Sequence, residues 1–282
     1  MNTPTPQLCA ISDETGPRFD DFLAFAAEAG LGWVEVRGID GINPLSLEPA
    51  QMESAAKRIA EAGLAVAGVA TPLFKWLPPG RTTQTVGDQF GFDRAGRTDM
   101  QLFEDAIAVA DAFETRNMRI FSYLAYDGFK LDDLTRDFDT LLALAERHDK
   151  VLRVENEHVC NVAHVSQLAD LLEVFNTPRL EGIPDVANSY WDGDHPSDSH
   201  IARVMKHSTH IHIKDYAIAR ERFVQLGQGD VPTEHYLRRI FEAAGNTQLT
   251  LSIETHVPEA PLEATRASLA ELRRILTAIG AA

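Results

Sequence analysis

The strongest constraint on the fold is a regular alternation of short apolar runs with longer stretches of helical periodicity along all 282 residues. Short apolar runs rich in β-branched residues are typical of strands, and apolar residues three and four positions apart are typical of helices. The expected strands cover residues 7–11, 32–37, 64–70, 118–124, 151–155, 180–186, 209–214 and 249–254. The helical stretches that follow them cover residues 18–30, 49–63, 99–113, 131–148, 166–175, 200–207, 233–245 and 262–279. This order predicts parallel strands joined by helices.

Eight strand–helix units at this chain length fit a TIM barrel, the α/β fold in which eight parallel strands close into a ring. A doubly wound open sheet is the alternative, but the sequence lacks the glycine fingerprint that binds phosphates in many such sheets. No linker or shift in composition divides the chain. We therefore expect residues 1–282 to form a single TIM-barrel domain.

Four chemically reactive side chains stand at or near the ends of four successive expected strands. Glu155 ends VLRVE, Asp185 ends LEGIPD, His212 lies near the end of THIHIK, and Glu254 ends LTLSIE. Neighbouring strands of a sheet lie about 4.8 Å apart, so their ends can converge on one ion. A single strand-end glutamate is more often a salt-bridge partner, but four successive units with a potential ligand favour a metal site.

Three carboxylates and one imidazole provide mostly oxygen donors with one nitrogen. This set suits Mn²⁺, Co²⁺, Mg²⁺ or Zn²⁺ better than a metal that prefers thiolates. We expect a divalent ion, with Mn²⁺ as the first choice. His210 shares a strand face with His212, and we expect it to pack nearby rather than to bind the ion.

Further charges lie within the expected strands. Glu35 and Arg37 share one face of their strand, and Arg153 shares a face with Glu155. The interior of a purely structural barrel prefers branched apolar residues. Because buried charges are costly unless they are paired, we expect Glu35, Arg37 and Arg153 to belong to an internal network of arginines and glutamates.

Two long loops follow expected strands and therefore lie on the catalytic face of a barrel. Residues 71–98 are too many for a plain connection, and they form either a substrate lid or an insertion that is mobile or contacts another subunit. Residues 215–231, which end in GQGDV, could also cover the site.

The composition excludes several classes of protein. A net charge of −16, from 42 acidic and 26 basic residues, argues against broad nucleic-acid binding. The two cysteines, Cys9 and Cys160, form no disulfide framework. No apolar run reaches the length of about 18 residues that a membrane-spanning helix needs, and the N-terminus lacks the order of a signal peptide. We expect a cytoplasmic protein that binds neither nucleic acid nor membranes.

Several segments, taken in chain order, resemble the sugar phosphate isomerase/epimerase group of the xylose-isomerase-like TIM barrel superfamily. They read RVENEHVCN at 153–161, DVAN at 185–188, HIHIKD at 210–215 and SIETH at 252–256. The segments ISDETGPRFDDF, WVEVRGIDG, TPLFK and GQGDV match the same group. The resemblance therefore covers nearly the whole chain, and it concerns fold and metal site more than substrate.

The resemblance implies that Glu155, Asp185, His212 and Glu254 bind one divalent ion. In the related ketose 3-epimerases, the two glutamates also transfer protons on opposite sides of the substrate, through an enediolate. By this likeness Glu155 and Glu254 are the expected catalytic residues of an isomerase or epimerase that acts on a sugar or sugar phosphate. The likeness is incomplete, because Asn188 stands where those epimerases have a histidine.

A second departure from the ketose 3-epimerases is Ile218, which lies near the position of their arginine. Both departures argue against a straightforward ketohexose 3-epimerase. We expect the substrate to contact residues on the loops next to the ligands. The candidates are His158, Asn188, Lys214, His256, Lys75 and Trp76. Lys214 could hold a substrate oxygen or phosphate, or it could pair with Asp215 or another acid.

Three other functions compete with an isomerase. A metal-dependent lyase or dehydratase acting on a keto-sugar or inosose would share the same site and work by β-elimination. A nuclease like endonuclease IV would need a multi-zinc cluster with more histidines, and this acidic chain lacks it. A non-catalytic sugar-binding barrel would not need the full ligand set. Apolar faces on the outer helices are compatible with a homodimer, as in relatives.

Overall fold

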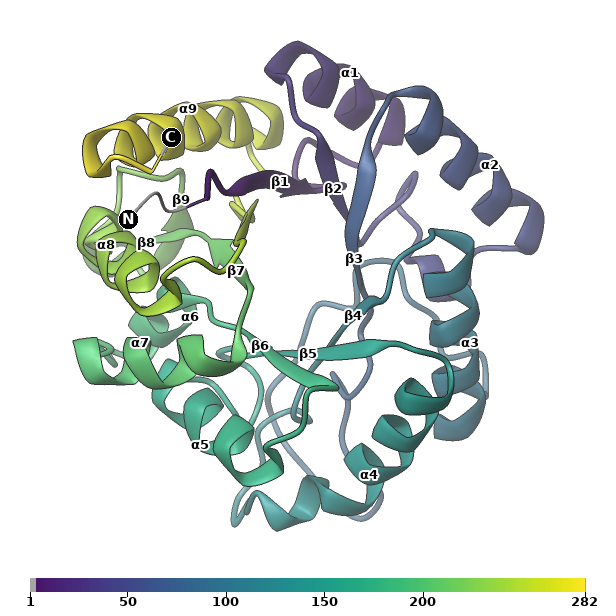
Figure 1. Cartoon of the computed structure of the whole chain (residues 1–282). Helices are drawn as coiled ribbons and strands as arrows, with labels where there is room; N and C mark the ends of the chain where they lie inside the picture. The colour runs from purple at the N-terminus through teal and green to yellow at the C-terminus, as the bar shows by residue number, and fades with distance from the viewer. Residues whose placement is uncertain (1–3, 282) are drawn as a thin grey trace.

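The computed structural model describes residues 4–281, and its eight parallel strands form a ring surrounded by helices (Figure 1). Neighbouring strands pair in the order β6-β5-β4-β3-β2-β1-β10-β7. The eight strands are β1 (Gln7–Ile11), β2 (Trp33–Val36), β3 (Ala65–Ala70), β4 (Asn117–Ile120), β5 (Val151–Glu155), β6 (Leu180–Ile183), β7 (His210–Ile213) and β10 (Thr250–Ile253). The expected TIM barrel is therefore confirmed.

The outer helices lie where the periodicity predicted them. They are α1 (Phe19–Ala29), α2 (Pro49–Glu61), α3 (Asp99–Ala112), α4 (Asp132–Arg147), α5 (Val165–Phe175), α7 (Asp198–Val204), α8 (Thr233–Ala244) and α9 (Pro261–Ile279). Local sequence explains several ends. Thr98 and Gln101 form a reciprocal capping box at the start of α3. Gly30 adopts a left-handed conformation that ends α1, as Gly residues do at many helix ends.

The barrel closes at a narrow seam between β6 and β7. Every other neighbouring pair of the eight strands is paired in parallel, with one register shift, between Val34 and Glu35, where β2 meets β3. Within residues 4–281, β6 and β7 are joined by a single isolated bridge between Asp185 and His212, where the His212 amide donates to the Pro184 carbonyl at 3.3 Å. Two of the four expected metal ligands therefore lie at the closure point of the barrel.

The apolar core lies between the strands and the outer helices, whereas the interior of the barrel is polar. Phe22, Leu102 and Phe138 on the helices are fully buried in the outer layer. Inside the ring, charged side chains such as Glu35 and Arg119 are also buried. Because buried charges are costly unless paired, this interior depends on a dense set of ion pairs.

Two elements near the site were not expected. Residues 180–186 form a shorter strand than predicted, and a short helix, α6 (Val186–Trp191), begins directly after Asp185. The loop 215–231 contains an antiparallel hairpin, β8 (Asp215–Ala217) and β9 (Arg222–Val224). Short 3-10 helices cover Pro44–Ser46, Met205–His207 and Ile218–Arg220.

Candidate functional site

The four strand-end residues meet at one point inside the catalytic rim. One ligand atom from each of Glu155, Asp185, His212 and Glu254 lies within 4.8 Å of the ligand atoms of the others. Nδ1 of His212 lies 3.0 Å from Oε1 of Glu155 and 3.3 Å from Oε2 of Glu254. All four side chains are buried. We call these four residues the quartet.

The two oxygens of Asp185 have different surroundings. Asp185 is the N-cap of α6, and its Oδ1 accepts a hydrogen bond from the Asn188 amide at 2.9 Å. Its Oδ2 lies 3.1 Å from Nζ of Lys214 but accepts no well-aligned hydrogen bond from the residues that the structure describes. The cap therefore fixes the carboxylate, and Oδ2 is left with only the ion pair to Lys214.

Three cations surround the quartet. Arg119 on β4 donates to Oε2 of Glu155 at 3.0 Å. Lys214, directly after β7, donates to Oε2 of Glu254 at 2.9 Å, and Arg37, directly after β2, donates to Oε1 of the same glutamate. The two expected catalytic glutamates are therefore held by different cations, Glu155 by Arg119 and Glu254 by Lys214 and Arg37.

Burial and these cations act in opposite directions on the acids of the quartet. Burial raises the pKa of Asp185 to about 6, because Lys214 only partly offsets it. Burial would also raise the pKa of Glu254, but Lys214 and His256 hold that pKa well below its usual range. Two imidazoles, His256 and His212, also lower the pKa of Glu254, whereas the neighbouring carboxylates of Glu254 and Glu155 raise that of Asp185, so the two acids shift in opposite directions.

His212 is surrounded by negative charge. Burial alone would lower the pKa of His212, but the carboxylates around it, Glu35 and Glu155 above all, raise that pKa well above its ordinary value. An imidazole that is stabilised in its cationic form occupies a site that favours positive charge. The same surroundings would stabilise a bound cation.

The quartet fits a divalent ion by the chemistry of its donors. Its three carboxylates and one imidazole are buried and close together. Oδ2 of Asp185 accepts no hydrogen bond from the described residues, so it can bind a cation. Hard divalent cations prefer oxygen ligands, with imidazole acceptable to Mn²⁺, Co²⁺ and Zn²⁺. Other groups of potential ligands overlap with the quartet, namely Glu35 with His210 and His212, and Glu14 with Glu254 and His256.

A pocket of about 490 Å³ opens above the quartet. Arg37 and His256 form part of its lining, and both contact Glu254, so the pocket reaches the quartet. Three of the six expected substrate residues, Lys75, His158 and His256, line it. This volume is within the range of about 300–1,000 Å³ that is usual for small-molecule sites.

The other three expected substrate residues do not line this pocket. Trp76 packs on Phe92 instead, at 6.3 Å between ring centroids. Asn188 is buried and donates to the Asn156 carbonyl at 2.9 Å. Lys214 lies beneath the pocket, where it pairs with the quartet rather than with Asp215.

The sequence did not predict the aromatic residues that line the pocket. Trp191 and Phe223 stack at 5.3 Å between centroids, and Phe90 stacks on His256 at 5.9 Å. Trp191 is on α6 and Phe223 is on the hairpin, the two elements that were not predicted. Two short strands separated by a turn within residues 215–231 could have indicated the hairpin. The GQGDV segment does not indicate which side chain of the hairpin faces the pocket.

Asp215 anchors this hairpin. Its carboxylate accepts hydrogen bonds from the amides of Gly227 and Gly229 at 2.9 Å each and of Val231 at 3.2 Å. A Cβ atom at Gly229 would collide with Asp215 and with the Tyr216 carbonyl. Gly229 is therefore required by the close approach of backbone to carboxylate, whereas Gly227 is favoured by its positive φ of 85°. Phe223 on this hairpin lies over Lys214, 4.5 Å from Nζ to the ring centroid.

The long loop 71–98 contributes directly to the pocket. Lys75, Val86, Asp88 and Phe90 from this loop line the pocket. Lys75 is buried, with Nζ 3.7 Å from Oε1 of Glu157 and 5.0 Å from the centre of the Phe90 ring. The loop therefore lies over the site, where a substrate lid would have to lie.

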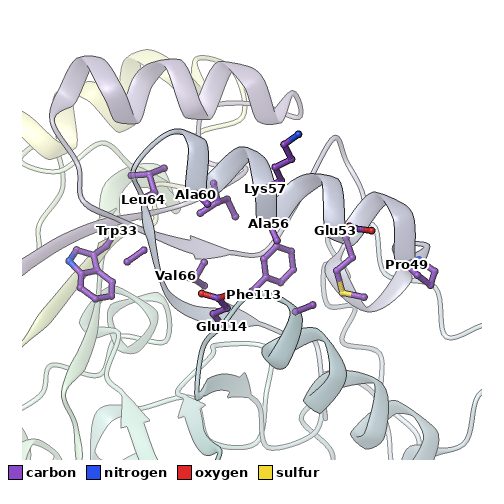
Figure 2. A pocket seen from close by; sticks show the side chains of 14 residues that line it. Trp33, Pro49, Glu53, Ala56, Lys57, Ala60, Leu64, Val66, Phe113 and Glu114 are labelled. Carbon is purple, nitrogen blue, oxygen red and sulfur yellow. The ribbon is translucent and has the colours of Figure 1, made fainter.

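A second cavity, of about 750 Å³, lies along α2 on the outside of the barrel (Figure 2). It is bounded by α2, by Trp33 and Val66 at the starts of β2 and β3, and by Phe113 and Glu114 before β4. Its lining follows α2 from Pro49 to Ala60 and includes no member of the quartet. None of the expected site residues lines it.

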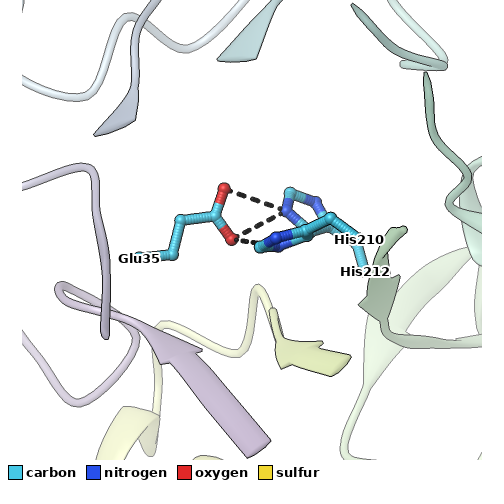
Figure 3. A group of neighbouring side chains, drawn as sticks. All are labelled: Glu35, His210 and His212. Atoms are coloured by element: carbon cyan, nitrogen blue, oxygen red, sulfur yellow. Dashed lines mark hydrogen bonds and ion pairs between the residues drawn. The ribbon is translucent and has the colours of Figure 1, made fainter. Parts of the chain in front are cut away.

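The interior network differs from expectation at one residue. Arg37 pairs with Glu14 at 2.7 Å and Arg153 pairs with Glu181 at 3.0 Å, so both belong to arginine–glutamate pairs as expected. The prediction was wrong for Glu35. Its carboxylate contacts the imidazoles of His210 and His212 instead (Figure 3), because the two histidines of β7 reach across the barrel to β2.

No helix within residues 4–281 is both long enough and apolar enough to cross a membrane. Cys9 and Cys160 are both buried free thiols, as the cysteine count indicated.

Comparison with known proteins agrees with this architecture. Residues 23–275 match the family model described as xylose isomerase-like TIM barrel. The IolI protein with a bound zinc atom superimposes with a TM-score of 0.75 at 14% identity, over 97% of this chain and 99% of that chain. A search of curated protein sequences finds no match.

Two further solved structures are similar. An L-ribulose 3-epimerase superimposes with a TM-score of 0.71 at 15% identity, over 97% of this chain and 95% of its own. The probable 3-DHS dehydratase AsbF from Bacillus anthracis gives a TM-score of 0.70 at 15% identity, over 95% of this chain and 98% of its own. At these identities the structures establish a shared fold. Because the family model spans most of the sequence, the chain belongs to the xylose isomerase-like TIM barrel family.

Proposed function

We propose that this protein is a divalent-metal-dependent isomerase or epimerase of a sugar or sugar phosphate. The observation that carries the proposal is the convergence of Glu155 and Glu254 on Nδ1 of His212, beside Asp185 and beneath a pocket of small-molecule size. The quartet would hold the ion, with Mn²⁺ as the first choice. Bound there, a divalent ion would supply Lewis-acid stabilisation of negative charge on substrate oxygens.

The two glutamates are suited to proton transfer at a carbon next to a carbonyl. Lys214 and Arg37 keep Glu254 ionised, which is the form that removes a proton. Glu155 is held separately by Arg119, so that the two carboxylates remain distinct groups. One glutamate would remove the proton and the other would return it, on opposite sides of the substrate.

The pocket walls support a small polar substrate with an apolar face. Nζ of Lys75 lies 3.7 Å from Oε1 of Glu157, beyond hydrogen-bond distance, and it can donate to a substrate oxygen. Arg37 and His256 lie between the pocket and Glu254. The rings of Trp191 and Phe223 offer a surface on which the C–H face of a sugar ring can pack. His158 lies against Trp191, 4.4 Å between centroids, in the same wall.

A lyase or dehydratase acting on a keto-sugar or inosose is the second candidate. It is favoured by Asn188, which stands where the ketose 3-epimerases have a histidine and which is tied to Asn156 outside the pocket. The likeness to a probable dehydratase supports the same alternative. In this reaction the second glutamate would protonate a departing hydroxyl group.

The test is solvent exchange in deuterium oxide. The metal-depleted protein is reloaded with Mn²⁺, Co²⁺, Mg²⁺ or Zn²⁺ and incubated with a panel of aldoses, ketoses, inososes and their phosphates. An isomerase or epimerase should exchange one substrate C–H with solvent, observed by NMR, whereas a lyase should yield an unsaturated product. Glu254→Gln should lower turnover by about 10²–10⁴-fold, the usual contribution of a general acid or base. The absence of exchange and elimination across the panel with metal-loaded protein would contradict the proposal.

We further propose that the partner is a small sugar, that the protein binds neither nucleic acid nor membranes, and that it works in the cytoplasm. The net charge of −16 is consistent with this. A homodimer remains a proposal, and sedimentation at micromolar concentration would test it.

A further inference from the structure

Glu35 lies beneath the quartet in a position that the proposed chemistry does not use. It is on β2, on the far side of the barrel interior from β7, and only 1% of its surface is exposed. Its carboxylate is shared by two imidazoles, His210 and His212 (Figure 3). Unlike Glu155 and Glu254, which pair with Arg119 and with Lys214 and Arg37, Glu35 is held by imidazoles alone among the described residues.

The protonation pattern of His210 follows from its other neighbour. Nη1 of Arg153 lies 3.2 Å from Nδ1 of His210. A guanidinium can only donate hydrogen bonds, so Nδ1 of His210 must accept. The ring proton of His210 is therefore on Nε2, which donates to Oε2 of Glu35 at 3.0 Å.

The same logic applies to His212. Its Nε2 lies 3.0 and 3.2 Å from the two oxygens of Glu35, and an ionised carboxylate can only accept. Nε2 of His212 therefore carries a proton that is held by Glu35. The remaining nitrogen, Nδ1, faces Glu155 and Glu254, the oxygens with which it would share an ion.

We propose that Glu35 is a positioning residue for metal binding, which holds the N–H of Nε2 so that Nδ1 of His212 is the ligating nitrogen. The inference rests on the proposed quartet site and extends it. A carboxylate that accepts from the second nitrogen of a ligating histidine fixes its tautomer and its ring orientation. Arg153 and His210 in turn fix Glu35, so the orientation is set by a continuous line of hydrogen bonds across the barrel.

The alternative use of this cluster, a second metal ion held by Glu35, His210 and His212, does not fit. It would need a free lone pair on Nε2 of His210, the atom that carries the proton. It would also place a cation next to Arg153. The cluster therefore serves the quartet rather than a separate ion.

The test measures metal binding and the identity of the ligating atom, without reference to turnover. The full-length protein is labelled with ¹⁵N-histidine and loaded with Zn²⁺, and long-range ¹H–¹⁵N correlation identifies which nitrogen of His212 is metal-bound. We expect Nδ1 to be ligated and Nε2 to keep its proton. Ligation through Nε2 in the unsubstituted protein would overturn the inference, whatever any variant does.

The matched variants are Glu35→Gln and Glu181→Gln. Chelator competition should show Zn²⁺ affinity about 10–100-fold weaker for Glu35→Gln, the usual loss for such partners. Glu181 pairs with the other end of Arg153 and contacts neither His212 nor the quartet, so Glu181→Gln should bind Zn²⁺ within about twofold of the unsubstituted protein. Equal affinity in Glu35→Gln and the unsubstituted protein would overturn the inference.

A third variant separates folding from binding. If Glu35→Gln fails to fold, Glu35→Asp keeps the charge on a shorter side chain, and it should weaken Zn²⁺ binding while retaining Nδ1 ligation; unchanged affinity would count against the inference. Failure of the proposed function is recognised independently. In that case the unsubstituted protein would bind no divalent ion, or Asp185→Asn would bind it as tightly as the unsubstituted protein does.

Discussion

Replacing Asp185 with Asn should remove most of the thermal stabilisation that a divalent ion gives this protein. The substitution is well suited to the question because asparagine is as good a helix N-cap as aspartate. Its side-chain oxygen can still accept from the Asn188 amide, so α6 should keep its start. What is lost is the anionic Oδ2, the oxygen that lacks a well-aligned partner among the described residues.

The size of the effect follows from linkage. An ion present at about 100 times its dissociation constant stabilises the folded state by about 2.7 kcal/mol. For 282 residues, an unfolding entropy of about 2.1 cal/mol/K per residue amounts to about 0.6 kcal/mol/K. The unsubstituted protein should therefore melt about 4–5 °C higher with the ion than without it. The variant should show less than about 1 °C at the same ion concentration.

The assay is differential scanning calorimetry across a titration of Mn²⁺ or Zn²⁺ after chelator treatment. His256→Asn is the matched control, because it disrupts the overlapping group of Glu14, Glu254 and His256 and leaves the quartet intact. It should keep the full shift. An undiminished shift in Asp185→Asn, or a lost shift in His256→Asn, would refute the assignment of the ion to the quartet.

Three further predictions concern pH, the hairpin and the thiols. The pKa of Asp185 is raised to about 6 in the metal-free protein and that of His212 is raised well above its ordinary value, so the ion must displace a proton from His212 and, below pH 6, from Asp185 as well. Isothermal titration should show affinity falling as the pH falls, more steeply below pH 6 than above it, and a flat profile between pH 5 and 7 would contradict this. In Gly229→Ala the new methyl group should collide with Asp215 and break the hydrogen bond from the residue 229 amide to that carboxylate. The free energy of unfolding in urea should fall by about 1.5–3 kcal/mol, and the substrate KM should rise. An unfolding midpoint equal to that of the unsubstituted protein would show that the contact is not needed. Burial raises the pKa values of the Cys9 and Cys160 thiols. Neither thiol should therefore react with a disulfide reagent at neutral pH in the native protein, and both should react after denaturation. Rapid labelling of the native protein would show that the thiols are not buried.

The site could be predicted from sequence only where a residue is placed by its own strand. Glu155 and His212 lie at strand ends whatever their neighbours are, and their convergence follows from the barrel. Lys75 and Trp76 are adjacent in sequence, yet only Lys75 lines the pocket. Trp76 packs on Phe92 instead, a contact that depends on how the long loop folds.

The internal network was beyond prediction for a different reason. Arg37 contacts Glu254 although the two are 217 positions apart in the chain. Glu35 contacts His212, 177 positions away. An arginine–glutamate network was a sound expectation from burial cost, but which charged groups pair is decided by which strands face each other across the barrel.

The amino-acid sequence by itself determined the eightfold alternation, the barrel and the four residues at successive strand ends, because periodicity and strand order are local properties of the chain. The tertiary structure alone decided which cation holds each glutamate, that Asp185 and His212 bridge the seam of the barrel, and that Phe223 covers the site. These contacts join distant segments, and their geometry depends on the closed ring. No local pattern can encode them, since each depends on the position of a partner elsewhere in the fold.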